Sequence, residues 1–360
     1  MDKPLEDHKI INTKWYHIDK DAIPAKLTYF GTSLKDGCTH PYIDLFLTDV
    51  GLTPTHARLV SEISLVGSFL SSIFWGMMTD YTKRKILILL LVSIGTATTM
   101  ILQPWIPMML NIANETCSKN LTISLNKTLR GAYRTKESDL RLFWVILASC
   151  TVTLFFDGYL LPHTDTSVMT QISQSSHKMD IGRNRVPGSA GFSLASFLVG
   201  ALSGVKGATL IISKYFIQHF LYAGAVFVFF ITSHFLLKKI DVKNVENSKE
   251  STRFSSIFSS LCTTLSSFYS IFFFLTLLCI FYCSFDVAGF AAVLMDELNF
   301  SGHMIGLVVA TSKVAGVLAY IFATKFIKLF RGTFQTFLVC CLCNIAQFAC
   351  YSYAKSRSLL

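Results

Sequence analysis

The amino-acid sequence predicts an all-α, polytopic helical membrane protein. Of its 360 residues, 52% are apolar and only 15% carry a charge, which gives a mean hydropathy of +0.49. A soluble domain of this length could not hydrate such a composition, whereas a bilayer can accommodate it. The 31 phenylalanines agree with this reading, since their rings can face lipid without a cost of hydration.

Apolar windows of membrane-spanning length recur along the chain. A spanning helix needs about 20 mostly apolar residues, and polar or charged segments separate the windows. Nine windows meet this requirement and are numbered as spans one to nine: residues 26–48, 57–78, 86–108, 142–163, 187–209, 215–237, 268–292, 303–325 and 333–354.

The spans divide the chain into four segments. A polar N-terminal tail precedes a half of six helices, and a basic linker leads to three further spans. In chain order the segments are residues 1–25, 26–237, 238–267 and 268–360. Because the chain begins with polar and charged residues, no cleavable signal peptide is expected.

Lysine and arginine residues are concentrated in alternate segments between the spans. If the N-terminal tail is cytoplasmic, the segments on that side carry most of the basic residues, as the positive-inside rule requires. Topology therefore explains the net charge of +10. The basic clusters are short and lack the continuous face of a nucleic-acid site. We expect a multi-pass protein of a eukaryotic plasma membrane or endomembrane.

The longest loop between spans, residues 110–141, carries sequons for N-glycosylation at Asn114, Asn120 and Asn126. The predicted topology places this loop outside, where glycans are attached. A fourth sequon, at Asn299, lies close to the ends of two spans, where the transferase has poor access. We therefore predict glycans in the 110–141 loop. An endoglycosidase should increase the electrophoretic mobility of protein from a eukaryotic host, and unchanged mobility would contradict the prediction.

A short loop between spans two and three contains the sequence Gly76-Met-Met-Thr-Asp80-Tyr-Thr-Lys83-Arg84-Lys85. Gly76 permits a close helix contact at the membrane edge, and Asp80 lies near a helix end, where it can cap the helix or pair with a base. The three basic residues anchor the turn at the lipid headgroups. The alternative reading is a basic inner loop with no further role.

The pattern Gly-x-x-x-Asp-x-x-Lys-Arg-Lys resembles motif A of the major facilitator superfamily, which occupies the same loop in those transporters. Thr82 and Lys83 replace the third glycine-containing step of that motif, which predicts a different local turn. Four segments resemble the branch around major facilitator superfamily domain-containing protein 6, related to sugar and nucleoside proton symporters. They are Pro41-Tyr42, Gly51-Leu-Thr-Pro54, Gly182-Arg183-Asn-Arg185 and Gly188-Ser-Ala-Gly191-Phe192.

The resemblance covers roughly residues 24–355 and implies a bundle of twelve helices in two halves related by a repeat. Nine spans correspond to the first half and the start of the second. The sequence is therefore expected to be a C-terminally truncated form of a twelve-helix protein, with a genuine nine-helix protein as the alternative.

Span one contains most of the ionisable residues within the spans. Asp36, His40 and Asp44 recur at every fourth position and so share one helix face, and Pro41 predicts a kink beside them. Two carboxylates flanking an imidazole form a plausible proton relay. The alternative is that Asp36 only neutralises Lys35 and that Asp44 is solvated. Adjacent helical residues point about 100° apart, so Lys35 and Asp36 are expected to pair with other helices.

Three further charged residues lie within spans, where each marks a candidate site. Lys313 lies near the middle of span eight and could pair with Asp286 of span seven or face Asp36 across a cavity between the halves. Asp157 in span four is followed by Pro162, and the resembling branch carries an acidic residue and a proline at about this spacing. We therefore place Lys35, Asp36, His40, Asp44, Asp157, Asp286 and Lys313 on the pathway of a solute and protons.

No nucleotide-binding loop, catalytic triad or zinc pair is recognisable, and Cys340, Cys341 and Cys343 lie in an apolar span without partner histidines or carboxylates. We therefore expect no enzyme activity, cofactor, metal or nucleic-acid partner. The leading hypothesis is a secondary active transporter of a small polar solute, with protons as a candidate coupling ion. The alternatives are a non-transporting receptor or binding protein on the same scaffold, and a nonfunctional fragment.

Overall fold

The computed structural model describes most of the chain. The residues described are 22–107, 109, 136–173, 181–203, 216–244, 266–268, 270–272, 275, 292–296, 298, 300–330 and 332–358. Within these ranges the regular elements are helices and none is a strand. The predicted all-α class is therefore confirmed.

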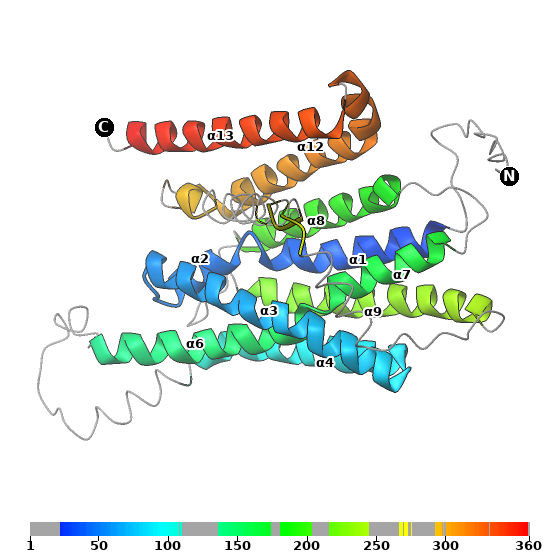
Figure 1. Ribbon diagram of the computed structural model, residues 1–360. Coiled ribbons are helices and arrows are strands. Elements are labelled where there is room, and N and C mark those ends of the chain that lie inside the picture. The colour runs from blue at the N-terminus through cyan, green and yellow to red at the C-terminus, as the bar shows by residue number, and fades with distance from the viewer. Residues whose placement is uncertain are drawn as a thin grey trace, which may run out of the picture.

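Ten α-helices and one 3-10 helix have defined ends in this part of the chain (Figure 1). In chain order they are α1 (Ile23–Thr39), α2 (Ile43–Asp49), α3 (Pro54–Thr82), α4 (Lys85–Leu102), the 3-10 helix η2 (Gln103–Trp105), α6 (Lys136–Asp157), α7 (Leu160–Ser173), α8 (Ile181–Ser203), α9 (Ile217–Asn244), α12 (Gly302–Leu329) and α13 (Thr333–Ser358). They overlap the predicted spans except span seven, most of which lies outside the described residues, and α7 continues to Ser173, beyond the predicted end of span four at residue 163.

Five helical segments in the described part of the chain are long and apolar enough to cross a membrane. They are Pro54–Thr82, Lys85–Trp105, Leu140–Ser173, Asn184–Ser203 and Ile217–Ile240. Their outward faces carry large apolar side chains such as Phe69, Ile94 and Phe227, of which more than half the surface is exposed. Water would solvate such a surface poorly, whereas lipid matches it. The structure thus has the form of an integral membrane protein.

Spans one and four are each built from two helices, and a proline accounts for each break. Pro41 has no N–H to donate to the carbonyl of Gly37, four residues earlier. That carbonyl accepts a hydrogen bond from Ser196 Oγ of α8 instead, at 3.0 Å. In span four, Pro162 likewise cannot donate to Gly158, which lies in the turn between α6 and α7. Both breaks therefore release a backbone carbonyl within a membrane-spanning segment.

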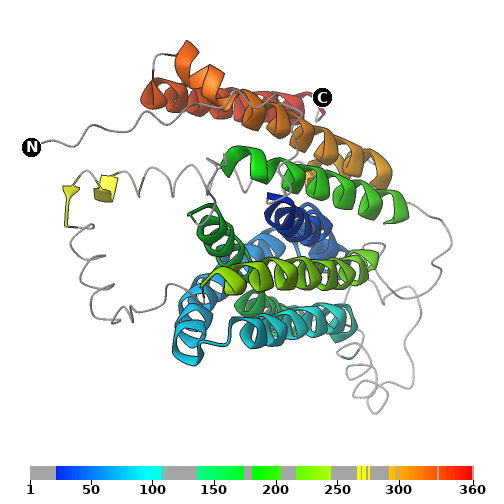
Figure 2. The same cartoon turned by 90° about the vertical axis from the view of Figure 1, so that its right-hand side faces the viewer.

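Helix α1 lies at the centre of the bundle and packs mainly against α8 and α9 (Figure 1). Helix α3 packs on α6, and α4 packs on α9 and α6. Figures 1 and 2 both show α12 and α13 stacked outside α8. Glycines allow the closest crossings. For example, a Cβ atom at Gly191 of α8 would lie 2.6 Å from the carbonyl oxygen of Phe30 in α1.

The α8–α12 contact joins the first six spans to span eight. A Cβ atom at Gly200 would lie 2.5 Å from the carbonyl oxygen of Gly302, and one at Gly306 would lie 2.7 Å from the carbonyl oxygen of Ser196. The hydroxyl of Tyr42 donates to the same Ser196 oxygen at 2.5 Å. The backbones of α8 and α12 therefore touch directly at these glycines, and we call this contact the glycine joint.

Candidate functional site

A buried lysine joins two aspartates at the centre of the bundle. Only 2% of the Lys35 side chain is exposed, and its Nζ atom lies 2.6 Å from Oδ1 of Asp36 and 2.8 Å from Oδ1 of Asp157. Charges within membrane spans are rare and are found paired. Helix α1 supplies the lysine and one carboxylate, and the last residue of α6 supplies the other. The three side chains, which we call the Lys35 triad, carry one excess negative charge.

Two further side chains complete the surroundings of the Lys35 triad. The Tyr222 hydroxyl of α9 donates a hydrogen bond to Oδ1 of Asp157, and Lys35 Nζ lies 5.8 Å from the centre of the Tyr222 ring. On the other side, His40 Nε2 lies 4.0 Å from Oδ1 of Asp36. The site thus brings together α1, α6 and α9, whose contributing residues are far apart in the sequence.

The pairing of Lys35 differs in part from the expectation. Lys35 does reach another helix, at Asp157, but it also binds its neighbour Asp36. Adjacent residues diverge by about 100° at the helix surface, yet the four-carbon stem of a lysine is long and flexible enough to bend back to the next carboxylate. Lys35 therefore binds both acids at once.

Lys313 of α12 supplies a second cation close to α1, because the residue it contacts, Phe192 of α8, packs directly on Gly37, the neighbour of Asp36. Its Nζ atom lies 4.4 Å from the centre of the Phe192 ring of α8, a cation–π contact. Among the described residues no carboxylate lies within 4 Å of this ammonium group. Asp286, the alternative partner expected from the sequence, lies outside the described residues. Lys313 is only partly buried.

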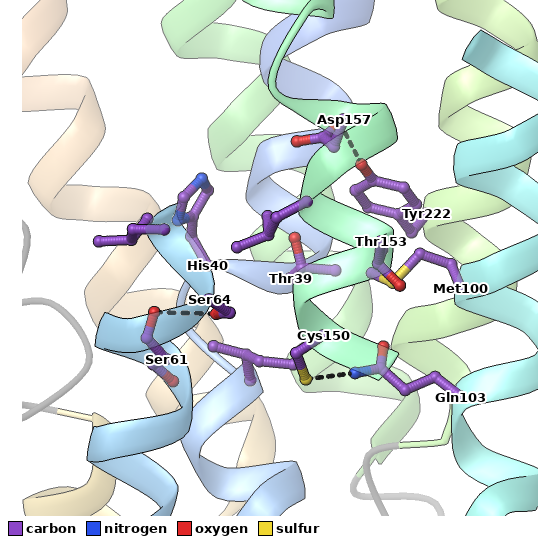
Figure 3. A pocket seen from close by; sticks show the side chains of 13 residues that line it. Thr39, His40, Ser61, Ser64, Met100, Gln103, Cys150, Thr153, Asp157 and Tyr222 are labelled. Atoms are coloured by element: carbon purple, nitrogen blue, oxygen red, sulfur yellow. Dashed lines mark hydrogen bonds between the residues drawn. The ribbon is translucent and has the colours of Figure 1, made fainter. Parts of the chain in front are cut away.

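A pocket opens beside the Lys35 triad (Figure 3). Its walls come from α1 to α4, η2, α6 and α9, and about 90 Å³ is open to the centres of water-sized molecules. A single water needs roughly 10–15 Å³ on this measure, so the pocket holds several waters or part of a small solute. His40, Asp157 and Tyr222 line one end, and Gln103 and Cys150 line the other. The His40 side chain is 40% exposed, although it lies within a membrane span.

Asp44 lies in α2, beyond the kink at Pro41. It is not an exposed carboxylate on the helix face that carries Asp36 and His40. It is 8% exposed and accepts a hydrogen bond from Ser61 of α3 at 2.5 Å. Arg58 lies 3.8 Å from its other oxygen and also pairs with Glu62 at 3.0 Å. Asp44 therefore connects α2 to α3 at the outer end of the proposed topology.

Arg185, from the segment Gly182-Arg183-Asn-Arg185, connects three helices at the opposite end of the bundle. Its Nη2 atom lies 2.7 Å from Oδ1 of Asp165 in α7, and the Tyr29 hydroxyl of α1 donates to the same oxygen at 2.7 Å. Gly188 follows in α8, where a Cβ atom would lie 2.8 Å from the Ser33 hydroxyl. Gly182 is the second residue of the same helix, and the side chain of Arg183 lies outside the described part of the chain.

The segment from Gly76 to Lys85, which resembles motif A, forms the turn between α3 and α4. Asp80 and the basic residues Arg84 and Lys85 are exposed. Lys83 ends α3 with φ of 55°, a left-handed conformation that glycine adopts more easily. Among the described residues, a Cβ atom at Gly76 would have nothing within 4 Å, so the close helix contact expected at this glycine is not formed there.

The expected glycosylation sites at Asn114, Asn120 and Asn126 lie outside the described residues, so the glycan prediction remains a prediction.

Sequence reasoning did not identify Tyr222, because a tyrosine in an aromatic-rich span carries no distinguishing local pattern. It also overlooked a repeat that marks the two aspartates. The segment Asp36-Gly37-Cys-Thr-His-Pro41 and the segment Asp157-Gly158-Tyr-Leu-Leu-Pro162 share the pattern Asp-Gly-x-x-x-Pro.

A helical bundle with an apolar outer face, broken spans and a partly solvent-accessible charged centre is the architecture of membrane transport proteins. Residues 23–360 match the MFS_1 like family, and the chain therefore belongs to that family within the major facilitator superfamily. The expected superfamily is thereby confirmed. Members of this superfamily are membrane transporters that bind small solutes within the membrane. Comparisons with the curated proteins and with the solved structures gave no match.

Proposed function

We propose that the chain is a secondary active transporter that moves a small polar solute by alternating access. The observation that carries this proposal is the Lys35 triad itself. Asp36 and Asp157 lie within membrane spans, yet 21% and 17% of their side chains are exposed. Charged groups at this depth that also reach a solvent-accessible pocket are typical of a solute pathway.

The solute would bind between the Lys35 triad and Lys313, beside His40, with the pocket beside Asp157 receiving part of it. The glycine joint supports alternating access, because it is a close backbone contact between the first six spans and α12. In the proposed topology the N-terminus is cytoplasmic and the glycine joint lies near the outer surface. The resemblance to the sugar and nucleoside symporter branch is part of the proposal, as is proton coupling through Asp36 and His40.

Reconstituted vesicles provide the test. We expect vesicles containing the protein to take up a small polar solute faster than empty vesicles, measured as swelling by light scattering, with a pH-sensitive dye inside to report protons. Asp157→Asn should lower solute flux by about ten-fold or more, because a charge-assisted contact is lost. Glu62→Gln, which alters a carboxylate of α3 that does not line the pocket, is the matched control and should keep its flux.

Asp36→Asn separates coupling from transport. Loss of the proton signal in this variant would support a coupling role. Unchanged solute-driven proton movement would exclude Asp36 as the coupling residue while leaving transport in place. Equal swelling of protein-containing and empty vesicles for every small solute offered would contradict the transport proposal and favour a binding role for the same site.

A further inference from the structure

The charges of the site are balanced overall but not locally. Lys35 lies between two carboxylates and can neutralise only one of them, so the Lys35 triad keeps one excess negative charge. Lys313 is the remaining cation, and within the described part of the chain it has the Phe192 ring as its neighbour and no carboxylate within 4 Å. The site therefore has a negative end on α1 and α6 and a positive end on α12.

Both ends lie in membrane-spanning helices, where an uncompensated charge is expensive. The face of an aromatic ring compensates an ammonium group only in part. A carboxylate hydrogen-bonded to Lys313 would compensate it further, and an ammonium group hydrogen-bonded to Asp36 or Asp157 would neutralise the excess charge of the triad. Asp36 cannot fully serve as the partner of Lys313, because it is already engaged by Lys35 through Oδ1.

We propose that the solute is a small zwitterion, with its ammonium group bound by Asp36 and Asp157 and its carboxylate bound by Lys313. This inference rests on the proposed function, because it assigns a solute class to the same site. The two charges of the solute match the two ends of the site in sign, so binding adds no net charge to the membrane interior.

Solutes with another charge pattern fit this site less well. An anion would pair with Lys313 but leave the negative charge of the triad uncompensated, and a cation would do the reverse. A neutral solute would leave both ends unpaired. The pocket beside Asp157 limits the remainder of the solute, because its far walls are uncharged and include Ile43, Leu65 and Met100. An uncharged side chain is therefore expected on the zwitterion.

Four three-carbon compounds of similar size separate these cases. Alanine carries both charges, alaninamide only the positive one, lactate only the negative one, and lactamide neither. The full chain in detergent is tested for thermal stabilisation by each compound, and proteoliposomes are tested for uptake of each. Alanine is expected to bind about ten-fold more tightly than each of the other three, because each lacks at least one charge-assisted contact.

Variants of Lys313 test whether this residue binds the carboxylate of the solute. Lys313→Gln should reduce the preference for alanine over alaninamide from about ten-fold to about one, whereas Lys313→Arg should keep most of it. Lys325→Gln is the matched control. Lys325 lies on the same helix and also contacts a ring, Phe322, at 5.3 Å, but it lies three turns away from Lys313. The thermal unfolding of each unliganded variant reports whether it has folded.

The outcomes distinguish the solute class from transport itself. Equal binding of alanine and lactamide, or an unchanged preference in folded Lys313→Gln, would overturn the zwitterion proposal. Protein-dependent uptake of glycerol without uptake or binding of alanine would do the same and leave transport standing. Selective stabilisation by alanine without uptake of any compound would support the zwitterion site and overturn transport. Neither binding nor uptake of any compound would overturn both.

Discussion

Replacing Lys35 with methionine is expected to lower the free energy of unfolding by about 3–5 kcal/mol, the range typical of removing one partner from a buried ion pair. The reason is that Asp36 and Asp157 would be left facing each other without the ammonium group that lies 2.6 Å and 2.8 Å from their oxygens. Chemical denaturation of the purified chain in detergent would measure the loss.

A matched lysine and a compensating variant separate charge from packing. Lys26 lies on the same helix, is only partly buried, and has no ion pair within 4 Å among the described residues. Lys26→Met should therefore change stability by less than about 0.5 kcal/mol. Adding Asp36→Asn and Asp157→Asn to Lys35→Met should recover part of the loss, because the unpaired charges are removed. Equal losses in Lys35→Met and Lys26→Met would contradict the assigned role of Lys35.

Gly306→Ala is expected to destabilise the protein by about 1–3 kcal/mol, as overpacking of a close contact does. The added methyl group would lie 2.7 Å from the backbone oxygen of Ser196 and 2.9 Å from the Tyr42 hydroxyl. Because a backbone oxygen cannot rotate away, α12 would have to move off α8. Thermal unfolding would measure the effect. Ser193 Oγ of α8 lies 3.1 Å from the carbonyl oxygen of Ala310 of α12, so a disulfide between cysteines introduced at these two positions would form more slowly.

Gly316 on the same helix provides the control, since a Cβ atom there would have nothing within 4 Å. Gly316→Ala should be neutral or stabilising by up to about 1 kcal/mol, because alanine favours the helix. Gly200→Ala should resemble Gly306→Ala, and the double variant should lose less than the sum, since both methyl groups force the same helix displacement. Equal changes in stability for Gly306→Ala and Gly316→Ala would contradict the importance of the glycine joint.

Local composition was sufficient to predict most of the helices. A run of about 20 apolar residues has few alternatives in a membrane, and the interruption near Pro41 follows from the missing N–H of proline. The family could also be recognised, because the pattern around Asp80 occupies the expected loop and the family match extends over residues 23–360.

The partners within the site could not be predicted in this way. Which carboxylate meets Lys35 depends on how the bundle places the end of α6 beside α1, and the two residues that meet there, Lys35 and Asp157, are more than a hundred positions apart. The role of Tyr222 depends on the same packing. Gly76 shows the converse, since its sequence context predicted a close contact that the helix arrangement does not make.

The repeated Asp-Gly-x-x-x-Pro segment accounts for the charge of the site. In both copies the glycine admits a neighbouring backbone, α8 at Gly37 and α3 at Gly158, and the proline breaks the span. The residue before each aspartate differs, however: it is Lys35 in the first copy and Phe156 in the second. The pattern supplies two acids and the chain supplies one lysine between them. The site carries an excess negative charge because the repeat provides an aspartate in both copies, whereas a lysine precedes the aspartate only in the first.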